Sequence, residues 1–164
     1  MSEPKKLCNF KRFKNFVTHP HYFWEIASLY NRWRNYLEDD YPEDFTRFAP
    51  FLWAITAPCD TPEDKFAGFV YLENFTGYKA EINVCFEREY WGDFVRECKP
   101  EFLNYCFNEL GLQKLTAYVY PQNRLVRGIL RDAGFTKEGH LHAETLKNGK
   151  PQDVEVWAKL GKEK

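Results

Sequence analysis

Three apolar runs of strand length follow one another in the middle of the chain, with no helical pattern between them. They cover residues 51–56 (FLWAIT), 66–73 (FAGFVYLE) and 79–86 (KAEINVCF). Turn-forming residues separate them: a Pro- and Asp-containing stretch at 58–64 and a tight turn at 74–77. Connections this short join antiparallel neighbours, because a parallel pair needs a long crossover. The middle of the chain is therefore predicted to be a three-stranded antiparallel meander.

Helical and strand patterns continue on both sides of this meander. Before it we expect a strand at 6–17, a helix at 21–37 and a short helix or ordered loop at 42–48. After it we expect a helix at 100–110, a strand at 113–120, a helix at 123–133, and a hairpin of residues 135–142 and 152–160 with its turn at 147–150. The order β-α-α-β-β-β-α-β-α-β-β predicts one α/β domain over residues 1–164, with a mixed, mostly antiparallel central sheet and helices on both faces.

Charge and hydropathy narrow the function classes. The formal net charge of -1 gives no electrostatic basis for wholesale nucleic-acid binding. No apolar stretch is long enough to cross a membrane, and the basic N-terminus is too polar for a secretory signal. The five cysteines are odd in number and form no CxxC motif, so we expect reduced thiols in a cytoplasmic protein.

No metal site is expected from the spacing of histidines and cysteines. His140 and His142 lie two apart on a predicted strand, so their side chains share one face, which is two-ligand spacing. With no third ligand in view, a plain polar face is the expectation.

The second half of the chain contains several short sequence motifs in a characteristic order and spacing. They are Phe107–Leu112 (FNELGL) before a strand, Asn123 followed by Gly134-Phe135, Glu138-Gly139, and Asn148-Gly149 followed by Asp153. Their order and spacing resemble the GNAT acetyltransferase superfamily, and most of all its Rim-type branch, from about residue 50 onward. Each motif also has an ordinary structural explanation as a helix cap or turn.

The resemblance implies a function and a co-substrate. It implies transfer of the acetyl group of acetyl-CoA to a primary amine, either a peptide N-terminus or a small molecule, and it is compatible with a homodimer. It also implies that the backbone of Val84, Cys85 and Phe86 holds the pantetheine arm as an added strand would, with a backbone N–H facing the thioester oxygen.

The expected phosphate loop departs from the family pattern. Trp91-Gly92 looks like the branch's WG, but Phe94 and Arg96 stand where small residues are usual, and Pro100 falls where a helix would be under way. In one interpretation the helix starts late, near Lys99-Pro100, and Arg96 or Lys99 contacts phosphate by charge. In the other the loop no longer binds CoA, and the domain is a catalytically degenerate binding or assembly protein.

The remaining site residues also follow from the resemblance. Asn123 matches a family asparagine near the cofactor, and it would serve equally as a helix N-cap. The tyrosine that the family often carries on the next helix is missing, so Tyr118 or Tyr120 on the preceding strand is the candidate acid, with Tyr120 preferred.

Glu81 is the candidate base, because its strand resembles the one that carries a catalytic glutamate in the histone-acetyltransferase branch. A solvent-facing strand residue is the alternative. Weaker candidates for the base, near the expected acceptor mouth, are Glu73, Glu144, His140 and His142.

The first half of the chain is crowded with aromatic residues. Aromatic residues make up 18% of the sequence, and they are dense between residues 22 and 53. Core packing accounts for most of them, and the remainder could shape an acceptor pocket or a partner surface.

Overall fold

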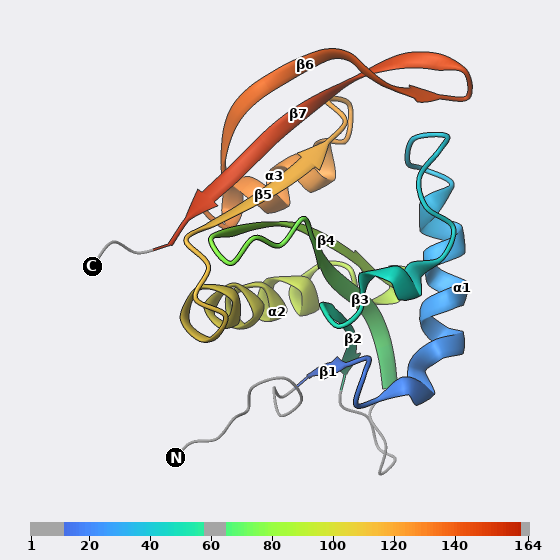
Figure 1. Ribbon diagram of the computed structural model, residues 1–164, viewed down its shortest axis with the longest axis vertical. Coiled ribbons are helices and arrows are strands. Elements are labelled where there is room, and N and C mark those ends of the chain that lie inside the picture. Colours follow the sequence, from blue (N-terminus) through green and yellow to red (C-terminus); the bar gives the residue numbers. More distant parts are fainter. Residues whose placement is uncertain (1–11, 58–64, 162–164) are drawn as a thin grey trace.

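The computed structural model describes residues 12–57 and 65–161. Its centre is a seven-stranded sheet with the order β1-β2-β3-β4-β5-β7-β6 (Figure 1). All neighbours are antiparallel except β4 and β5, which are parallel. The strands are β1 (Phe13–Asn15), β2 (Leu52–Ala57), β3 (Lys65–Glu73), β4 (Lys79–Phe86), β5 (Lys114–Val119), β6 (Thr136–Lys147) and β7 (Lys150–Leu160). Seven strands, mostly antiparallel, confirm the predicted fold class.

Helices cover both faces of the sheet. They are α1 (Phe23–Arg34), α2 (Asp93–Asn104) and α3 (Arg124–Asp132), with single 3-10 turns at Pro20–Tyr22, Phe45–Phe48 and Arg88–Tyr90. α1 packs on one face, and α2 and α3 pack on the other. In the described part of the chain no helix has the length and apolar character needed to cross a membrane.

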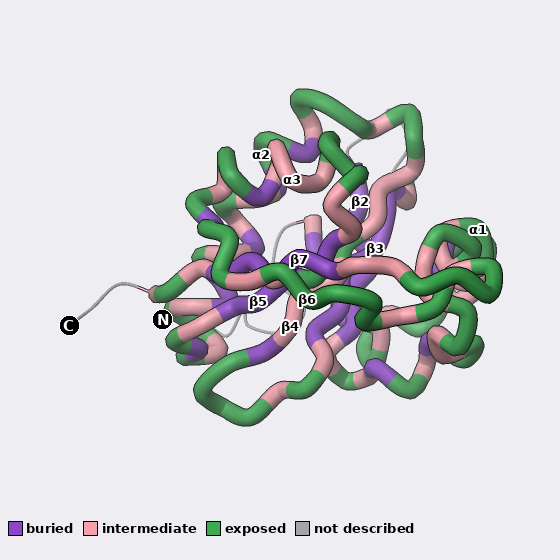
Figure 2. Tube along the Cα trace, turned by 90° about the horizontal axis from the view of Figure 1, so that it is seen from above, coloured by how far each residue is buried: buried purple, intermediate pink, exposed green. Residues whose placement is uncertain are grey.

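Each face of the sheet has its own aromatic core. On the α2 side Trp53 is fully buried, with its ring edge-on to Phe102 at 5.2 Å between centroids. On the α1 side Tyr30 is fully buried, and Phe48 stacks on Tyr71 at 3.9 Å. Figure 2 shows the buried segments concentrated in the central strands, while the outer part of the β6–β7 hairpin is exposed. Most of the aromatic excess is therefore core, as the sequence indicated.

The start of α2 corrects the sequence interpretation. The helix begins at Asp93 and contains Pro100, so the prediction of a helix that starts near Lys99-Pro100 is wrong. Gly92 adopts φ 106°, which lets the chain turn directly into the helix, and Val95, Cys98 and Phe102 then bury one helical face. This burial outweighs the cost of the interior proline, which lacks the N–H for the carbonyl four residues earlier and whose ring crowds that carbonyl. After Asn104 the chain continues as a π-helical turn, Tyr105–Glu109.

Other boundaries differ less. The hairpin strands are longer than predicted and meet at a two-residue turn, where Asn148 and Gly149 both have positive φ. The first strand is confirmed over Phe13–Asn15, whereas residues 6–11 of that prediction and the turn at 58–64 lie outside the described residues.

Candidate active site

β4 and β5 separate in the centre of the sheet. They pair with each other only where Lys79–Glu81 faces Lys114–Thr116. Beyond that, β4 runs on to Phe86 and β5 to Val119 without pairing with each other in the described chain. The β5 side of β4 is thus an open backbone edge in mid-sheet from Ile82 up to the Phe86 carbonyl, which accepts a hydrogen bond from the Trp91 indole N–H at 3.1 Å. Backbone N–H and C=O groups need partners, so such an edge suits an extended ligand that bonds as a strand would.

The predicted residues Val84, Cys85 and Phe86 all lie on this open segment. The Val84 side chain is 42% exposed, whereas Cys85 packs against the α1-side core. Burial raises the pKa of the Cys85 thiol to about 12, so it stays protonated and un-ionised at neutral pH. The Cys85 thiol is therefore unsuited to the gap, and the Cys85 carbonyl oxygen lies close to Gly68 on β3.

α2 begins just beyond this edge. Gly92 is its N-cap, and a Cβ built there would meet nothing within 4 Å, so the glycine is needed for its φ rather than for space. The first-turn N–H groups of Asp93, Phe94 and Val95 have no acceptor within the helix. Together with the helix dipole they form a site suited to an anion.

Two cations near α2 are engaged within the protein. Arg96 Nη2 lies 2.7 Å from Asp93 Oδ1, and these side chains are 65% and 90% exposed. Lys99 Nζ donates to the Ile129 carbonyl at 3.3 Å and so links α2 to α3. Lys99 therefore packs helix against helix, while Arg96 remains a predicted phosphate ligand that would have to leave Asp93.

Asn123 is the N-cap of α3. Its Oδ1 accepts a hydrogen bond from the Val126 N–H at 3.2 Å. This is the capping role that the sequence allowed, and it leaves the amide Nδ2 of Asn123 as a donor for a ligand.

A pair of facing carboxylates lies on the α1 side of the sheet, one on β3 and one on β4. Glu73 and Glu81 are cross-strand partners, an arrangement that destabilises a sheet through like charge. Glu73 Oε1 accepts from Asn83 Nδ2 and from the Tyr41 hydroxyl, both at 3.2 Å, and Glu81 Oε1 accepts from Asn74 Nδ2 at 2.9 Å. Donors from three segments thus hold both carboxylates in place.

Glu81 occupies the last paired position before β4 and β5 separate. Burial, and after it the charge of Glu73, raise the pKa of the half-buried Glu81 carboxyl. The charge of Glu81 in turn adds to burial in raising the pKa of Tyr118 on β5, which is half exposed. The structure therefore brings Glu81 and Tyr118 together beside the gap.

A third carboxylate comes from the loop after α1. Burial raises the pKa of Glu38, and the charges of Asp40 and Glu73 act in the same direction. Sequence reasoning missed Glu38, and it named Glu73 only as a weaker candidate. The register of the hairpin around residues 74–77 was the signal that could have placed Glu73 opposite Glu81.

Tyr120 lies just after the end of β5, among different neighbours. Its hydroxyl is buried beside that of Thr145, with which it can form a hydrogen bond. Burial raises the Tyr120 pKa, and the charges that act on it are those of Glu38 and Asp39. Tyr120 therefore faces the α1 loop and the hairpin.

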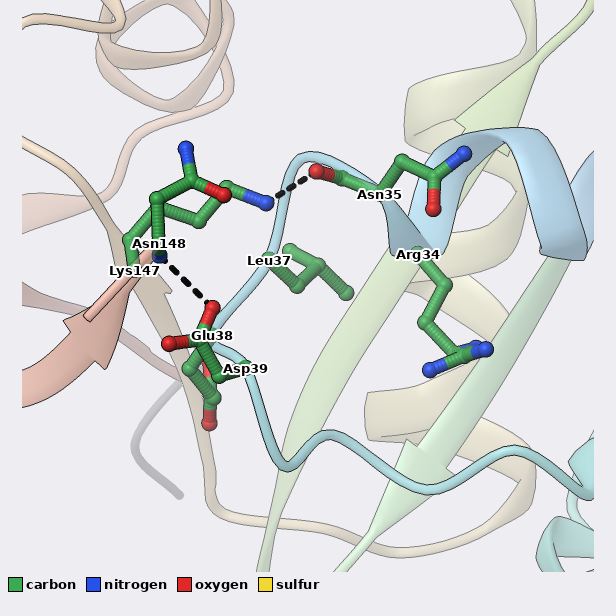
Figure 3. A pocket seen from close by; sticks show the side chains of 7 residues that line it. All are labelled: Arg34, Asn35, Leu37, Glu38, Asp39, Lys147 and Asn148. Carbon is green, nitrogen blue, oxygen red and sulfur yellow. Dashed lines mark hydrogen bonds between the residues drawn. The ribbon is translucent and has the colours of Figure 1, made fainter.

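The far end of the β6–β7 hairpin is tied to that loop. The Asp39 carboxylate accepts the N–H groups of Asn148 at 2.7 Å and Gly149 at 2.9 Å, and Lys147 Nζ donates to the Asn35 carbonyl. Figure 3 shows these groups around a small hollow between the loop and the hairpin, lined by Arg34, Asn35, Leu37, Glu38, Asp39, Lys147 and Asn148. The tie holds Glu38 and Tyr120 on the same side of the molecule.

Comparison with known families settles what kind of domain this is. The model of the acetyltransferase (GNAT) domain matches residues 7–136. The chain belongs to the GNAT acetyltransferase family. An uncharacterized N-acetyltransferase, YoaA of Bacillus subtilis, is 33% identical over 81 residues, covering 49% of this chain and 46% of that protein. The spermidine N(1)-acetyltransferase of Vibrio cholerae is 33% identical over 82 residues, covering 49% and 47%. The chain spans about half the length of the curated relatives it matches.

Solved structures agree on the GNAT fold. A variant of the spermidine N-acetyltransferase of Vibrio cholerae superposes with a TM-score of 0.70 at 22% identity, covering 85% of this chain and 90% of that one. The Vibrio cholerae spermidine N-acetyltransferase in complex with CoA and spermine gives a TM-score of 0.60 at 27% identity, covering 66% and 64%. The family resemblance is confirmed. Of the relatives described above, those whose names give a substrate are spermidine acetyltransferases, so the comparisons do not single out the Rim-type branch.

Proposed function

We propose that this GNAT protein transfers the acetyl group of acetyl-CoA to a primary amine of a polyamine-like cation. The observation that carries the proposal is the separation of β4 from β5 beyond Glu81, with α2 beginning just past the open edge. This arrangement offers an extended ligand a backbone edge at one end and an anion site at the other. Acetyl-CoA, the acetyl donor of the family, has a pantetheine arm and a pyrophosphate that match these two parts.

On the donor side, the backbone of Val84, Cys85 and Phe86 would hold the pantetheine arm. The first-turn amides of α2 would hold the pyrophosphate, with the Arg96 guanidinium moving from Asp93 to phosphate. The Nδ2 group of Asn123 adds a donor at the start of α3. The fit is incomplete in two places: the Phe86 carbonyl already accepts from the Trp91 indole N–H, and the Asp93 carboxylate adds a negative charge to the first turn of α2.

On the acceptor side, the carboxylates of Glu38, Glu73 and Glu81 favour a substrate that carries several positive charges. Spermidine and spermine are such cations, and relatives with those molecules in their names or structures support this class. Burial strengthens the attraction, because the charges act in a medium of lower dielectric than water.

Acetyl-CoA would supply an activated carbonyl at the open edge. The acceptor ammonium must first lose a proton, and Glu81, with its raised pKa, is the proposed base that accepts it. The hydrogen bond from Asn74 to Oε1 holds the Glu81 carboxylate in place. A backbone N–H of β4 would donate to the oxygen on which negative charge develops. A phenol of β5 would return a proton to the leaving thiolate. Tyr120 was the predicted donor, and Tyr118 is the phenol beside Glu81.

The first experiment is calorimetric titration of the protein with acetyl-CoA, followed by a thiol-release assay with spermidine, spermine and a peptide with a free N-terminus. We expect binding, and turnover that is fastest with the two polyamines. Turnover of the peptide alone would replace the polyamine class with the N-terminal amine of the Rim-type branch. No binding of acetyl-CoA at millimolar concentration would support the degenerate binding protein instead.

A further inference from the structure

The β6–β7 hairpin brings together three metal-ligating side chains that the transfer site does not use. His140 Nε2 lies 2.8 Å from Asp153 Oδ2, and His142 Nδ1 lies 3.3 Å from the same oxygen. The three ligand atoms all lie within 4.8 Å of one another, and the two imidazole rings are 4.8 Å apart between centroids. Asp153 supplies the third ligand that the His140–His142 spacing lacked in the sequence.

The backbone explains why these side chains converge. His140 pairs with Glu155 and Leu141 with Val154, but the register then shifts before Thr145 pairs with Gln152. The extra residues of β6 form a bulge in which Ala143 takes a positive φ of 51°. The Ala143 N–H donates to Asp153 Oδ1 at 2.8 Å. One carboxylate oxygen is thus fixed by backbone, and the other points at both imidazoles.

We propose that His140, His142 and Asp153 form a binding site for a divalent transition-metal ion of the zinc class. Two imidazoles and one carboxylate are typical ligands of Zn²⁺, and three protein ligands leave a fourth position for water. The bond from the Ala143 N–H to Asp153 is the outer-shell support that such ligands usually have. Hard cations such as Mg²⁺ prefer an all-oxygen set and are not expected here.

The distances are compatible with this ion. Bonds of about 2.0–2.1 Å in a tetrahedral site place ligand atoms roughly 3.3 Å apart. The two distances to Asp153 Oδ2, 2.8 and 3.3 Å, are close to that value. Only the separation of the two imidazole nitrogens has to shorten. The His142 side chain is 82% exposed, so it can rotate at little cost.

The site is separate from the acceptor carboxylates of the acetyl-transfer site. Asp153 alternates along β7 with Glu155 and Trp157, and this is the face that α3 covers. The acceptor carboxylates lie on the opposite, α1 face. Glu155 is not a ligand, because it is already paired with Arg127 at 3.0 Å and Lys137 at 3.2 Å.

The test uses the full chain without a histidine tag. Zn²⁺ and Mg²⁺ are titrated separately by calorimetry, and the imidazole signals of the four histidines are followed by NMR. We expect one Zn²⁺ per chain, no binding of Mg²⁺, and shifts confined to His140 and His142. His142→Ala and Asp153→Asn should each weaken Zn²⁺ binding more than about tenfold.

The matched control is His21→Ala, which removes one of the two neighbouring histidines at the other end of the chain, His19 and His21, whose rings are 5.9 Å apart. This variant should bind Zn²⁺ as the unchanged chain does. Because His142 is largely exposed, His142→Ala should fold normally, which circular dichroism checks. The proposal fails if the unchanged chain binds no Zn²⁺, if His142→Ala binds it equally well, or if the shifts fall on His19 and His21.

Discussion

At the scale of single residues, the surroundings of Glu81 raise the pKa of its carboxyl and so make it a stronger base. Its carboxyl is half-buried, faces the charge of Glu73, and is held by one amide from Asn74. The first two effects favour the protonated form, and the third favours the carboxylate. Glu81 thus has a raised pKa at the position where β4 and β5 separate, which is the combination a base for an ammonium needs.

We expect Glu81→Gln to lower the turnover of acetyl transfer by about a hundredfold or more, with little change in acetyl-CoA affinity. A glutamine keeps the size and the bond with Asn74 but cannot accept a proton. In the unchanged enzyme, turnover should rise with pH through a pKa above the ordinary 4.5 of a glutamate, because the carboxylate is the active form. Initial rates measured against pH, together with calorimetry, check both points. A wild-type rate profile in Glu81→Gln would remove Glu81 from the mechanism.

At the scale of elements, the start of α2 shows what a linear pattern does and does not predict. The apolar spacing of Val95, Cys98 and Phe102 was visible in the sequence, but Pro100 suggested a later start. The boundary of α2 is decided by the burial of one helical face, which is not a local property, together with the positive φ of Gly92. The position of the hairpin turn at Asn148-Gly149 was predicted well, because this type of turn depends on those two residues themselves.

The N-terminus of α2 should bind anions better without Asp93. The Asp93 carboxylate lies on the first turn and holds Arg96 at 2.7 Å. Asp93→Asn keeps the shape, removes the competing negative charge and frees Arg96, so acetyl-CoA affinity should rise about two- to fivefold. Arg96→Ala should lower it. Calorimetry on both variants tests this, and a weaker Asp93→Asn would mean that the pair is needed as it stands.

The tie between the α1 loop and the hairpin should depend on pH. Hydrogen bonds from the N–H groups of Gly149 and then Asn148 hold the pKa of Asp39 below its usual value. The tie is therefore complete above the ordinary carboxyl pKa and is lost as pH falls through the lowered one. Asp39→Ala should speed amide exchange at Asn148 and Gly149 at neutral pH. The neighbouring Asp40→Ala serves as control, and equal exchange in both variants would contradict the role of Asp39.

At the scale of the whole molecule, one sheet serves two cores, so the two should unfold together. Trp53→Ala on the α2 side and Phe69→Ala on the α1 side each remove a fully buried ring. Each should lower the free energy of unfolding by about 3–5 kcal/mol, whereas Trp24→Ala, at an exposed position, should change it by less than about 0.5 kcal/mol. Denaturant curves read by fluorescence and by circular dichroism should coincide. Two separate transitions would show that the faces are independent.

At this scale, the parts of the site that the sequence could predict differ from the parts that it could not. The strand that carries Val84, Cys85 and Phe86 and the helix cap at Asn123 follow from local patterns, and both lie where they were expected. The carboxylate of Glu38 and the third ligand at Asp153 meet groups from segments far apart in sequence. Their meeting depends on strand register and on a bulge, which composition and spacing do not encode.

The short parallel pairing between β4 and β5 has a mechanical consequence. Within the sheet, four strands on one side and three on the other are joined by three residue pairs, and outside it the α2-side core and the tie at Asp39 connect them. We expect this seam to be where one block of strands moves most easily against the other. A molecule lodged along the open edge would bridge the two blocks and stiffen the joint. Entry and departure of the donor are then expected to set how fast the blocks swing, so the slow motions of the protein should gather at this seam.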